Sequence, residues 1–175
     1  MIIARHKNPN LNRNINPKLN RNINPNLNRN INPILNRNIN PILNRNINPV
    51  LNRNINPFLN RNINPILNRS INPILNRNIN PVLNRNINPN INMNFNGLYL
   101  FDLNNSPIEF IVEANDQVIQ MFDFELKNTG FGVKHIQNGY SIFDLNNNYK
   151  GHFESDSIDG YNYFDSNNNW IGFVK

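Results

Sequence analysis

Oxygen-bearing side chains recur at a fixed spacing in the second half of the chain and could coordinate a cation. In three segments an Asp is followed at every second position by Asn or Ser: Asp102-x-Asn104-x-Ser106, Asp144-x-Asn146-x-Asn148 and Asp165-x-Asn167-x-Asn169. This alternation resembles the start of a calcium-binding loop, but the Gly of the sharp turn and the bidentate Glu are missing. We therefore expect each Asp to cap a turn by accepting backbone N–H groups, and we predict no metal site and no cofactor.

A carboxylate follows Phe four times at intervals of 21 residues, in Asp102, Asp123, Asp144 and Asp165. Four carboxylates brought close together would raise one another's pKa or attract a cation. On the rim of a fold, solvent screens such charges and their mutual interaction is weak. We expect the rim position.

Candidates for catalysis are scarce. The chain has no Cys, and neither His135 nor His152 has an Asp or Ser at a spacing typical of a catalytic triad. His152 stands at the repeat position that Phe110, Phe131 and Phe173 fill in the other units, which predicts a partly buried structural side chain. No Gly-rich phosphate loop and no zinc-ligand spacing occurs. The sequence therefore predicts no catalytic residue and a protein that is not an enzyme.

The segments that carry these side chains follow a repeat of 21 residues. The pairs Phe101-Asp102, Phe122-Asp123, Phe143-Asp144 and Phe164-Asp165 mark four units. In each unit, alternating apolar and polar residues lead to the Asp, which is the pattern of a half-buried β-strand with one face toward solvent. A mostly polar turn follows, and a second apolar segment ends the unit. Because Asn and Asp favour turns, each unit is predicted to be one β-hairpin.

Eight short strands follow from this reading. The first strands of the units begin at Gly97, Val118, Gly139 and Gly160, and the second strands span 108–112, 129–133, 150–153 and 171–174. Gly130, Gly151 and Gly172 share one position, where a missing side chain allows a bulge or the close approach of a neighbouring backbone. Unit two has Glu125-Leu126-Lys127 in its turn, so we expect its hairpin to be the least regular.

Closure about an axis is the predicted arrangement, because a lone hairpin is only marginally stable and an open solenoid would need capping units. The expected fold is all-β, with four pseudo-symmetric 21-residue hairpin units closed about an axis. Leu100, Met121, Ile142 and Tyr163 would then meet in a shared interior, as a candidate cup for a small apolar ligand, a lipid or a peptide. Aromatic residues that favour packing and could line such a cup are Tyr140, Tyr149, Tyr161, Tyr163 and Trp170.

The four Phe-Asp hairpin units of residues 93–175 resemble the four-fold β-flower domain, a bacterial family of pseudo-symmetric hairpins. The resemblance implies a shallow radial all-β cup with an apolar centre. It implies no established enzymatic activity and supplies no catalytic residues. It does not extend to residues 1–92.

A second repeat, of different character, fills residues 1–92. The octapeptide Asn-Pro-x-Leu-Asn-Arg-Asn-Ile occurs ten times from Asn8 to Ile87, and a degraded copy covers 88–95. Only the third position varies freely, so packing is not expected to constrain it. Alternation places Pro, Leu, Arg and Ile on one side of an extended chain, while the regular Pro prevents a central strand. Polar low-complexity tracts rarely bury enough surface to fold, so the array is predicted to be disordered or extended.

Charge divides at the same boundary. Residues 1–92 hold 13 Lys and Arg and no Asp or Glu, whereas the remainder holds four basic and eleven acidic residues. One Arg per octapeptide could bind phosphates without sequence selectivity, which makes nucleic acid or another polyanion the alternative ligand. Aromatic residues for base stacking are almost absent there. The candidate contacts are Arg13, Arg21, Arg29, Arg37, Arg45, Arg53, Arg61, Arg69, Arg77 and Arg85.

Two domains are predicted, an octapeptide array over 1–92 and a hairpin domain over 93–175. Met93 opens a segment of 83 residues, one short of four units of 21, so a further hypothesis is that residues 1–92 are an upstream extension that is not translated. No signal peptide or membrane span is recognisable, which makes the cytoplasm the default location. The principal expected function is non-catalytic binding or scaffolding.

Overall fold

The hairpin domain is a closed barrel of eight antiparallel strands in the computed structural model, which describes residues 3–175. The strands are β1 (Leu98–Asp102), β2 (Pro107–Glu113), β3 (Val118–Phe122), β4 (Asn128–His135), β5 (Gly139–Asp144), β6 (Tyr149–Ser155), β7 (Tyr161–Asp165) and β8 (Trp170–Val174). Each pairs with its neighbours in the sequence, and β1 pairs with β8 to close the barrel. The predicted hairpins and their closure are confirmed.

All four hairpins share one irregularity, at the bond that precedes the Phe of each Phe-Asp pair. Their pairing register shifts between Leu100 and Phe101, Met121 and Phe122, Ile142 and Phe143, and Tyr163 and Phe164. The predicted Gly position lies beside this bulge. A Cβ added at Gly130 or Gly172 would lie 2.5 Å from a backbone carbonyl oxygen of the next unit, so the predicted close approach is also present.

Both faces of the barrel wall are apolar. Inside, one buried cluster comprises Leu100, Ile111, Ile119, Met121, Tyr140, Ile142, Phe153 and Val174. Outside, seven Phe side chains alternate with the inward set and are at most 2% exposed: Phe101, Phe110, Phe122, Phe131, Phe143, Phe164 and Phe173. A barrel standing alone would place these rings in water, so a second layer has to cover them.

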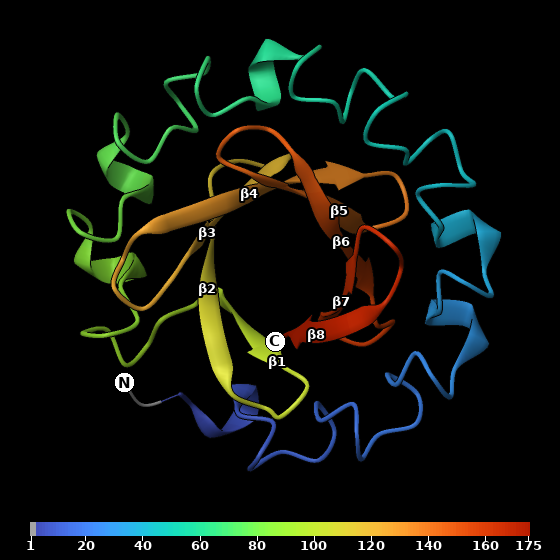
Figure 1. The fold of residues 1–175 in the computed structure, drawn as a ribbon. Helices are drawn as coiled ribbons and strands as arrows, with labels where there is room; N and C mark the ends of the chain where they lie inside the picture. Colours follow the sequence, from blue (N-terminus) through green and yellow to red (C-terminus); the bar gives the residue numbers. More distant parts are fainter. Residues whose placement is uncertain (1–2) are drawn as a thin grey trace.

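The octapeptide array is that second layer. Figure 1 shows it as a ring of turns around the barrel, from the blue N-terminal segment to the green segment that precedes β1. Some turns are short 3₁₀ helices: η1 (Arg5–Lys7), η2 (Arg29–Ile31), η3 (Arg37–Ile39), η4 (Arg61–Ile63), η5 (Arg77–Ile79) and η6 (Arg85–Ile87). The two ends of the ring meet, because Lys7 Nζ donates to the carbonyl oxygens of Phe95 and Gly97 at 3.2 and 2.6 Å.

Asn side chains join each octapeptide to the one before it. At the first position, Asn24 Oδ1 accepts the N–H of Asn26 at 2.9 Å, and Asn24 Nδ2 donates to the carbonyl oxygen of Pro17 at 2.9 Å. At the fifth position, Asn28 Nδ2 donates to the carbonyl oxygen of Asn22 at 2.6 Å. The same bonds recur along the ring. Repeated Asn therefore satisfies backbone groups that a chain without strands would leave unpaired.

The Ile and Pro of the octapeptides face the barrel. Eight of the ten eighth-position Ile are buried, and all eleven Pro from Pro9 to Pro89 are buried as well. Ile55, Ile63 and Ile71 belong to one cluster with Phe131 and Phe143 of the barrel. Array and barrel thus share a hydrophobic core.

The array also covers the polar residues of the first strands, which the strand alternation had placed on a solvent face. Gln120 and Asn162 are at most 1% exposed. Gln120 Nε2 donates to the carbonyl oxygen of Ile71 at 2.8 Å, and Asn162 Nδ2 donates to that of Ile23 at 3.0 Å. The reading of half-buried strands is therefore wrong, because these amides bond to a second layer instead of water.

The array is extended along the barrel, which was one of the two predicted alternatives, and it is not disordered. Buried Ile and Pro and the Asn bonds supply the stabilisation that composition did not reveal. The prediction that Pro, Leu, Arg and Ile share one side of the chain is wrong, because Leu and Arg face solvent while Ile and Pro face the barrel. Freedom at the third position is confirmed, since Phe58 and Ile74 are 66% and 81% exposed.

The hypothesis of an untranslated extension stays a prediction, and the fold gives it a consequence. A chain that began at Met93 would keep Phe95 but lack the octapeptides of residues 8–87, whose Ile side chains pack on the outward Phe side chains. Those rings would then be exposed on the barrel surface.

Shared packing predicts that a cavity in the array destabilises the barrel. We expect Ile63→Ala to lower the free energy of unfolding by about 3 kcal/mol, because Ile63 is buried against the barrel. The control Leu67→Ala, four residues away and half exposed, should cost less than about 1 kcal/mol. Urea unfolding followed by the fluorescence of the single Trp170 on β8 measures both. Equal effects of the two substitutions would contradict the shared core.

Candidate functional site

Each hairpin turn is capped by the Asp that follows Phe. Asp144 Oδ1 accepts the backbone N–H groups of Asn146 and Asn148 at 2.9 and 2.8 Å. Burial favours the neutral form of the Asp144 carboxyl and would raise its pKa. Hydrogen bonds from Asn148 and the backbone have the larger combined effect, so the pKa of this carboxyl lies below its usual value. Equivalent pairs of bonds are made by Asp102, Asp123 and Asp165. The four carboxyls are partly exposed, so the expected caps on a rim are confirmed.

The turn of unit two has the same geometry as the others, contrary to expectation. Leu126 has a φ of 68°, close to the 65° of Asn147 at the equivalent position. Leu is rarely found in this left-handed region. Its side chain packs against the buried cluster that contains Phe110 and Phe122, which offsets the strain. Within residues 3–175, no group of three or more His, Asp or Glu side chains is placed to hold a metal ion.

A capping role predicts how substitutions of Asp144 will differ. Asp144→Ala removes both acceptor bonds and should lower the free energy of unfolding by about 1 kcal/mol. Asp144→Asn keeps the Oδ1 acceptor and should cost less than half as much. Urea unfolding of both variants, with and without added Ca²⁺, makes the comparison. Cation binding would be indicated instead if Asp144→Asn lost as much unfolding free energy as Asp144→Ala. It would also be indicated if Ca²⁺ stabilised the native sequence and neither variant.

A pair of ionisable side chains lies buried between the barrel and the array. His135 Nε2 is 3.4 Å from Glu154 Oε1, and both side chains are 1% exposed. Gly139, the partner of His135 on the next strand, makes room for the imidazole, because a Cβ there would lie 2.6 Å from His135 Cε1. Burial raises the pKa of Glu154, and the facing imidazole opposes that rise. Repeat spacing did not reveal this pair, since the two residues occupy non-equivalent positions in different units.

His152 fills the Phe position of its unit, as predicted, and is fully buried. Its ring stacks on Phe164 with centroids 5.3 Å apart, and its Nδ1 lies 3.0 Å from the hydroxyl of Tyr149. Burial, with a smaller contribution from His135, lowers the pKa of His152 to about 3. Ser141, its partner on β5, is also fully buried. Both side chains are therefore shielded from solvent.

The buried imidazole predicts an acid-labile fold. Unfolded His takes up a proton near pH 6.5, whereas native His152 does so only near pH 3, so stability falls as the pH drops below about 6.5. The loss from this group is at most about 1.4 kcal/mol per pH unit. Phe occupies the equivalent positions of the other units. The substitution His152→Phe should therefore remove this contribution to the loss of stability at low pH. Urea unfolding from pH 7.5 to 4.5 tests it, and parallel curves for the two proteins would contradict the assignment.

The four residues of the predicted ligand cup lie together in the barrel interior, but as packing. Leu100, Met121 and Ile142 are buried, and Tyr163 packs against their cluster. A cavity of about 90 Å³ lies inside the barrel, and none of these four residues lines it. That cavity lies one layer nearer the end at which β1 begins.

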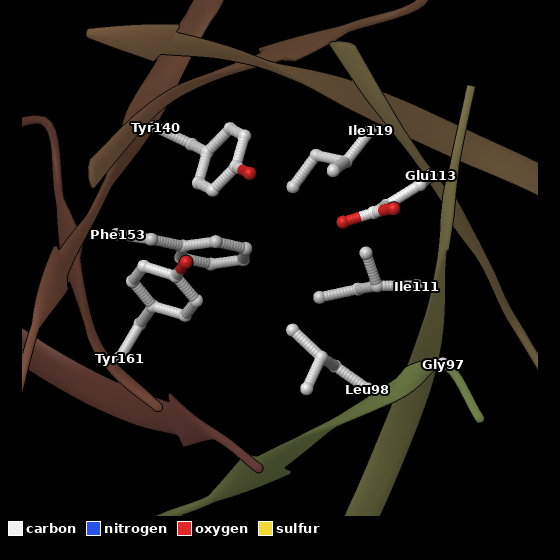
Figure 2. A pocket seen from close by; sticks show the side chains of 8 residues that line it. All are labelled: Gly97, Leu98, Ile111, Glu113, Ile119, Tyr140, Phe153 and Tyr161. Atoms are coloured by element: carbon white, nitrogen blue, oxygen red, sulfur yellow. The ribbon is translucent and has the colours of Figure 1, made fainter. Parts of the chain in front are cut away.

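Figure 2 shows the side chains that line this cavity. Aromatic rings of Tyr140, Phe153 and Tyr161 form one side, and Leu98, Ile111 and Ile119 lie opposite them with Glu113. Leu98, Ile119, Tyr140 and Tyr161 occupy equivalent places in the four units, two residues before the predicted cup. Glu113 was missed, although its spacing of two residues from the inward-facing Ile111 could have indicated it.

All ten candidate Arg side chains of the array are exposed. Among residues 3–175, the ion pairs join His135 to Glu154 and Lys175 to Asp156 and Asp159, and no array Arg takes part. The Arg side chains are placed by the turns: burial of Ile and Pro forces the intervening Leu-Asn-Arg-Asn to face outward.

The octapeptide is oriented along the barrel axis. Its third position lies beside the Asp-capped turns, because Asn10 and Asn90 bond to the carbonyl oxygens of Asn105 and Phe124. Its Arg position lies toward the other end of the barrel. Asn46 and Asn54, which directly follow Arg45 and Arg53, line a depression at that end together with Gln117 and other loop residues. The Arg-bearing part of the octapeptide and the capping carboxylates therefore lie toward opposite ends of the molecule.

Comparison with known proteins finds no match: no family model, no curated protein and no solved structure resembles the chain. The likeness to the β-flower family stays a prediction from the hairpin repeat. In the portion of the chain that the structure describes, no helix is long and apolar enough to cross a membrane.

Proposed function

We propose that the protein is a non-catalytic binding protein whose array binds a flexible polyanion, with single-stranded nucleic acid as the ligand class. One observation carries the proposal: ten exposed Arg side chains, one per octapeptide, encircle the barrel on a segment that contains no acidic residue. The ligand is recognised by its phosphates, and its base sequence matters little.

The charge of the array is available for a ligand. A guanidinium without a carboxylate partner can donate two parallel hydrogen bonds to one phosphate. The formal charge of residues 1–92 is +13, and the acidic residues all lie after residue 92. Each neutralised phosphate releases condensed counterions, so affinity should fall steeply as salt rises.

The ring shape favours a flexible chain over a straight duplex. A duplex can touch only an arc of the ring, whereas a single strand can follow its circumference and meet successive Arg side chains (Figure 1). Phe58 is the only aromatic residue of the ten intact octapeptides, so base stacking adds little. The central cup as a site for an apolar ligand, lipid or peptide has less support, because its four residues fill the interior.

The test is fluorescence anisotropy of a labelled single-stranded oligonucleotide at several salt concentrations. We expect the logarithm of the affinity to fall linearly with that of the salt concentration, by about 0.7 for each phosphate contacted. Replacing every second Arg with Gln, at Arg13, Arg29, Arg45, Arg61 and Arg77, should roughly halve the slope. A duplex of equal length should bind more weakly.

A matched control replaces five exposed Leu of the same array with Gln, at Leu19, Leu35, Leu51, Leu67 and Leu83, which changes the surface without changing its charge. This variant should keep the native slope. The proposal fails if the Arg and Leu variants lose affinity equally, or if binding does not depend on salt.

A further inference from the structure

The cavity near the end of the barrel at which β1 begins combines an aromatic wall with a carboxylate. The rings of Tyr140 and Tyr161 meet edge to face with centroids 5.6 Å apart, and Phe153 lies 6.3 Å from Tyr161. In Figure 2 the carboxylate of Glu113 points into the cavity from the other side. We propose that this cavity binds a small organic ammonium cation, such as a methylated amine. The site is separate from the Arg ring and does not depend on the proposed polyanion binding.

The electrostatic balance of the cavity favours a cation. Among residues 3–175 no ion pair includes Glu113, so its charge is not neutralised by another side chain. Burial raises the pKa of both Tyr140 and Tyr161, which keeps their hydroxyls neutral. Lys134 lines a neighbouring depression outside the cavity. Lys175 is held by Asp156 and Asp159.

The side chains that line the cavity favour an organic cation over a metal ion. An ammonium group is attracted to aromatic faces, and aromatic cages recognise methylated ammonium groups in this way. The aliphatic side chains of Leu98, Ile111 and Ile119 offer contacts to methyl groups but no oxygen ligands. The carboxylate of Glu113 and the hydroxyls of Tyr140 and Tyr161 are too few oxygen ligands to replace the water of a strongly hydrated metal ion.

The size of the cavity limits the ligand. An apolar cavity of about 150 Å³ in another protein accommodates benzene. The present cavity of about 90 Å³ therefore admits a group of roughly four heavy atoms. The four heavy atoms of a trimethylammonium group meet this limit. Because Glu113 is exposed and Leu98 and Tyr161 are only partly buried, a further methyl group or longer substituent on the nitrogen can lie at the edge of the cavity.

The four units also differ in chemistry at the cavity. The equivalent places Leu98, Ile119, Tyr140 and Tyr161 are aliphatic in units one and two and aromatic in units three and four. Glu113 has Lys134 and Ser155 at the equivalent places of units two and three. Simple packing of a repeated barrel does not require one carboxylate opposite an aromatic wall, whereas a cation site does.

The test titrates the full-length protein with tetramethylammonium chloride and, separately, with tert-butanol, a neutral molecule of similar size, at constant ionic strength. Chemical shifts of the Tyr140, Tyr161 and Leu98 side chains locate binding and give the affinity. We expect saturable shifts with tetramethylammonium and affinity at least about tenfold weaker for tert-butanol.

Two substitutions separate a built site from general ion effects. Glu113→Gln should weaken tetramethylammonium at least about tenfold and leave tert-butanol unchanged. Glu125→Gln, which removes an exposed carboxyl near the opposite end, should leave both unchanged. Because Glu113 is exposed, its variant should keep the native unfolding midpoint. Equal affinity for the two ligands, equal effects of the two variants, or no shift at the cavity residues would overturn the proposal.

Discussion

The molecule depends on mutual burial of two sets of apolar side chains, the outward Phe of the barrel and the inward Ile of the array. The outward Phe rings stack on one another in pairs, but the array supplies the Ile side chains that pack over them, and within residues 3–92 the array forms no strands of its own. A short barrel and a polar repeat thereby share one hydrophobic core. The remaining features, including exposed Arg and buried polar pairs, follow from the orientation that this burial imposes on each octapeptide.

Much of the barrel was predictable because its signals are local. The Phe-Asp spacing indicated four hairpins, and an Asp carboxylate caps its own turn whatever lies elsewhere. The burial of Gln120 and Asn162 was not predictable in this way, since a polar residue on alternate strand positions ordinarily faces water. Their partners are backbone oxygens of residues 49 and 139 positions away. A stronger signal was present in the Phe of each Phe-Asp pair, which made the supposed solvent face apolar as well.

The array was harder to interpret because one of its two regularly spaced aliphatic residues is buried and the other is exposed. Ile at the eighth position is buried and Leu at the fourth is exposed, yet hydropathy treats them alike. The freedom of the third position correctly indicated exposure. For the candidate sites, repeat register found the Arg side chains and the interior layer of the barrel. The four predicted cup residues pack together in that layer, and the cavity lies one layer nearer the end of the barrel, where Glu113 lines it.

The central claim is that array and barrel form one cooperative unit, and hydrogen exchange of the full-length protein in increasing denaturant tests it most directly. The array N–H groups that bond within turns, such as those of Leu67 and Asn68, should be protected in native buffer. They should lose protection at the same denaturant concentration as the strands β1 to β8. Array amides that exchange at unfolded rates while the strands stay protected would contradict the account.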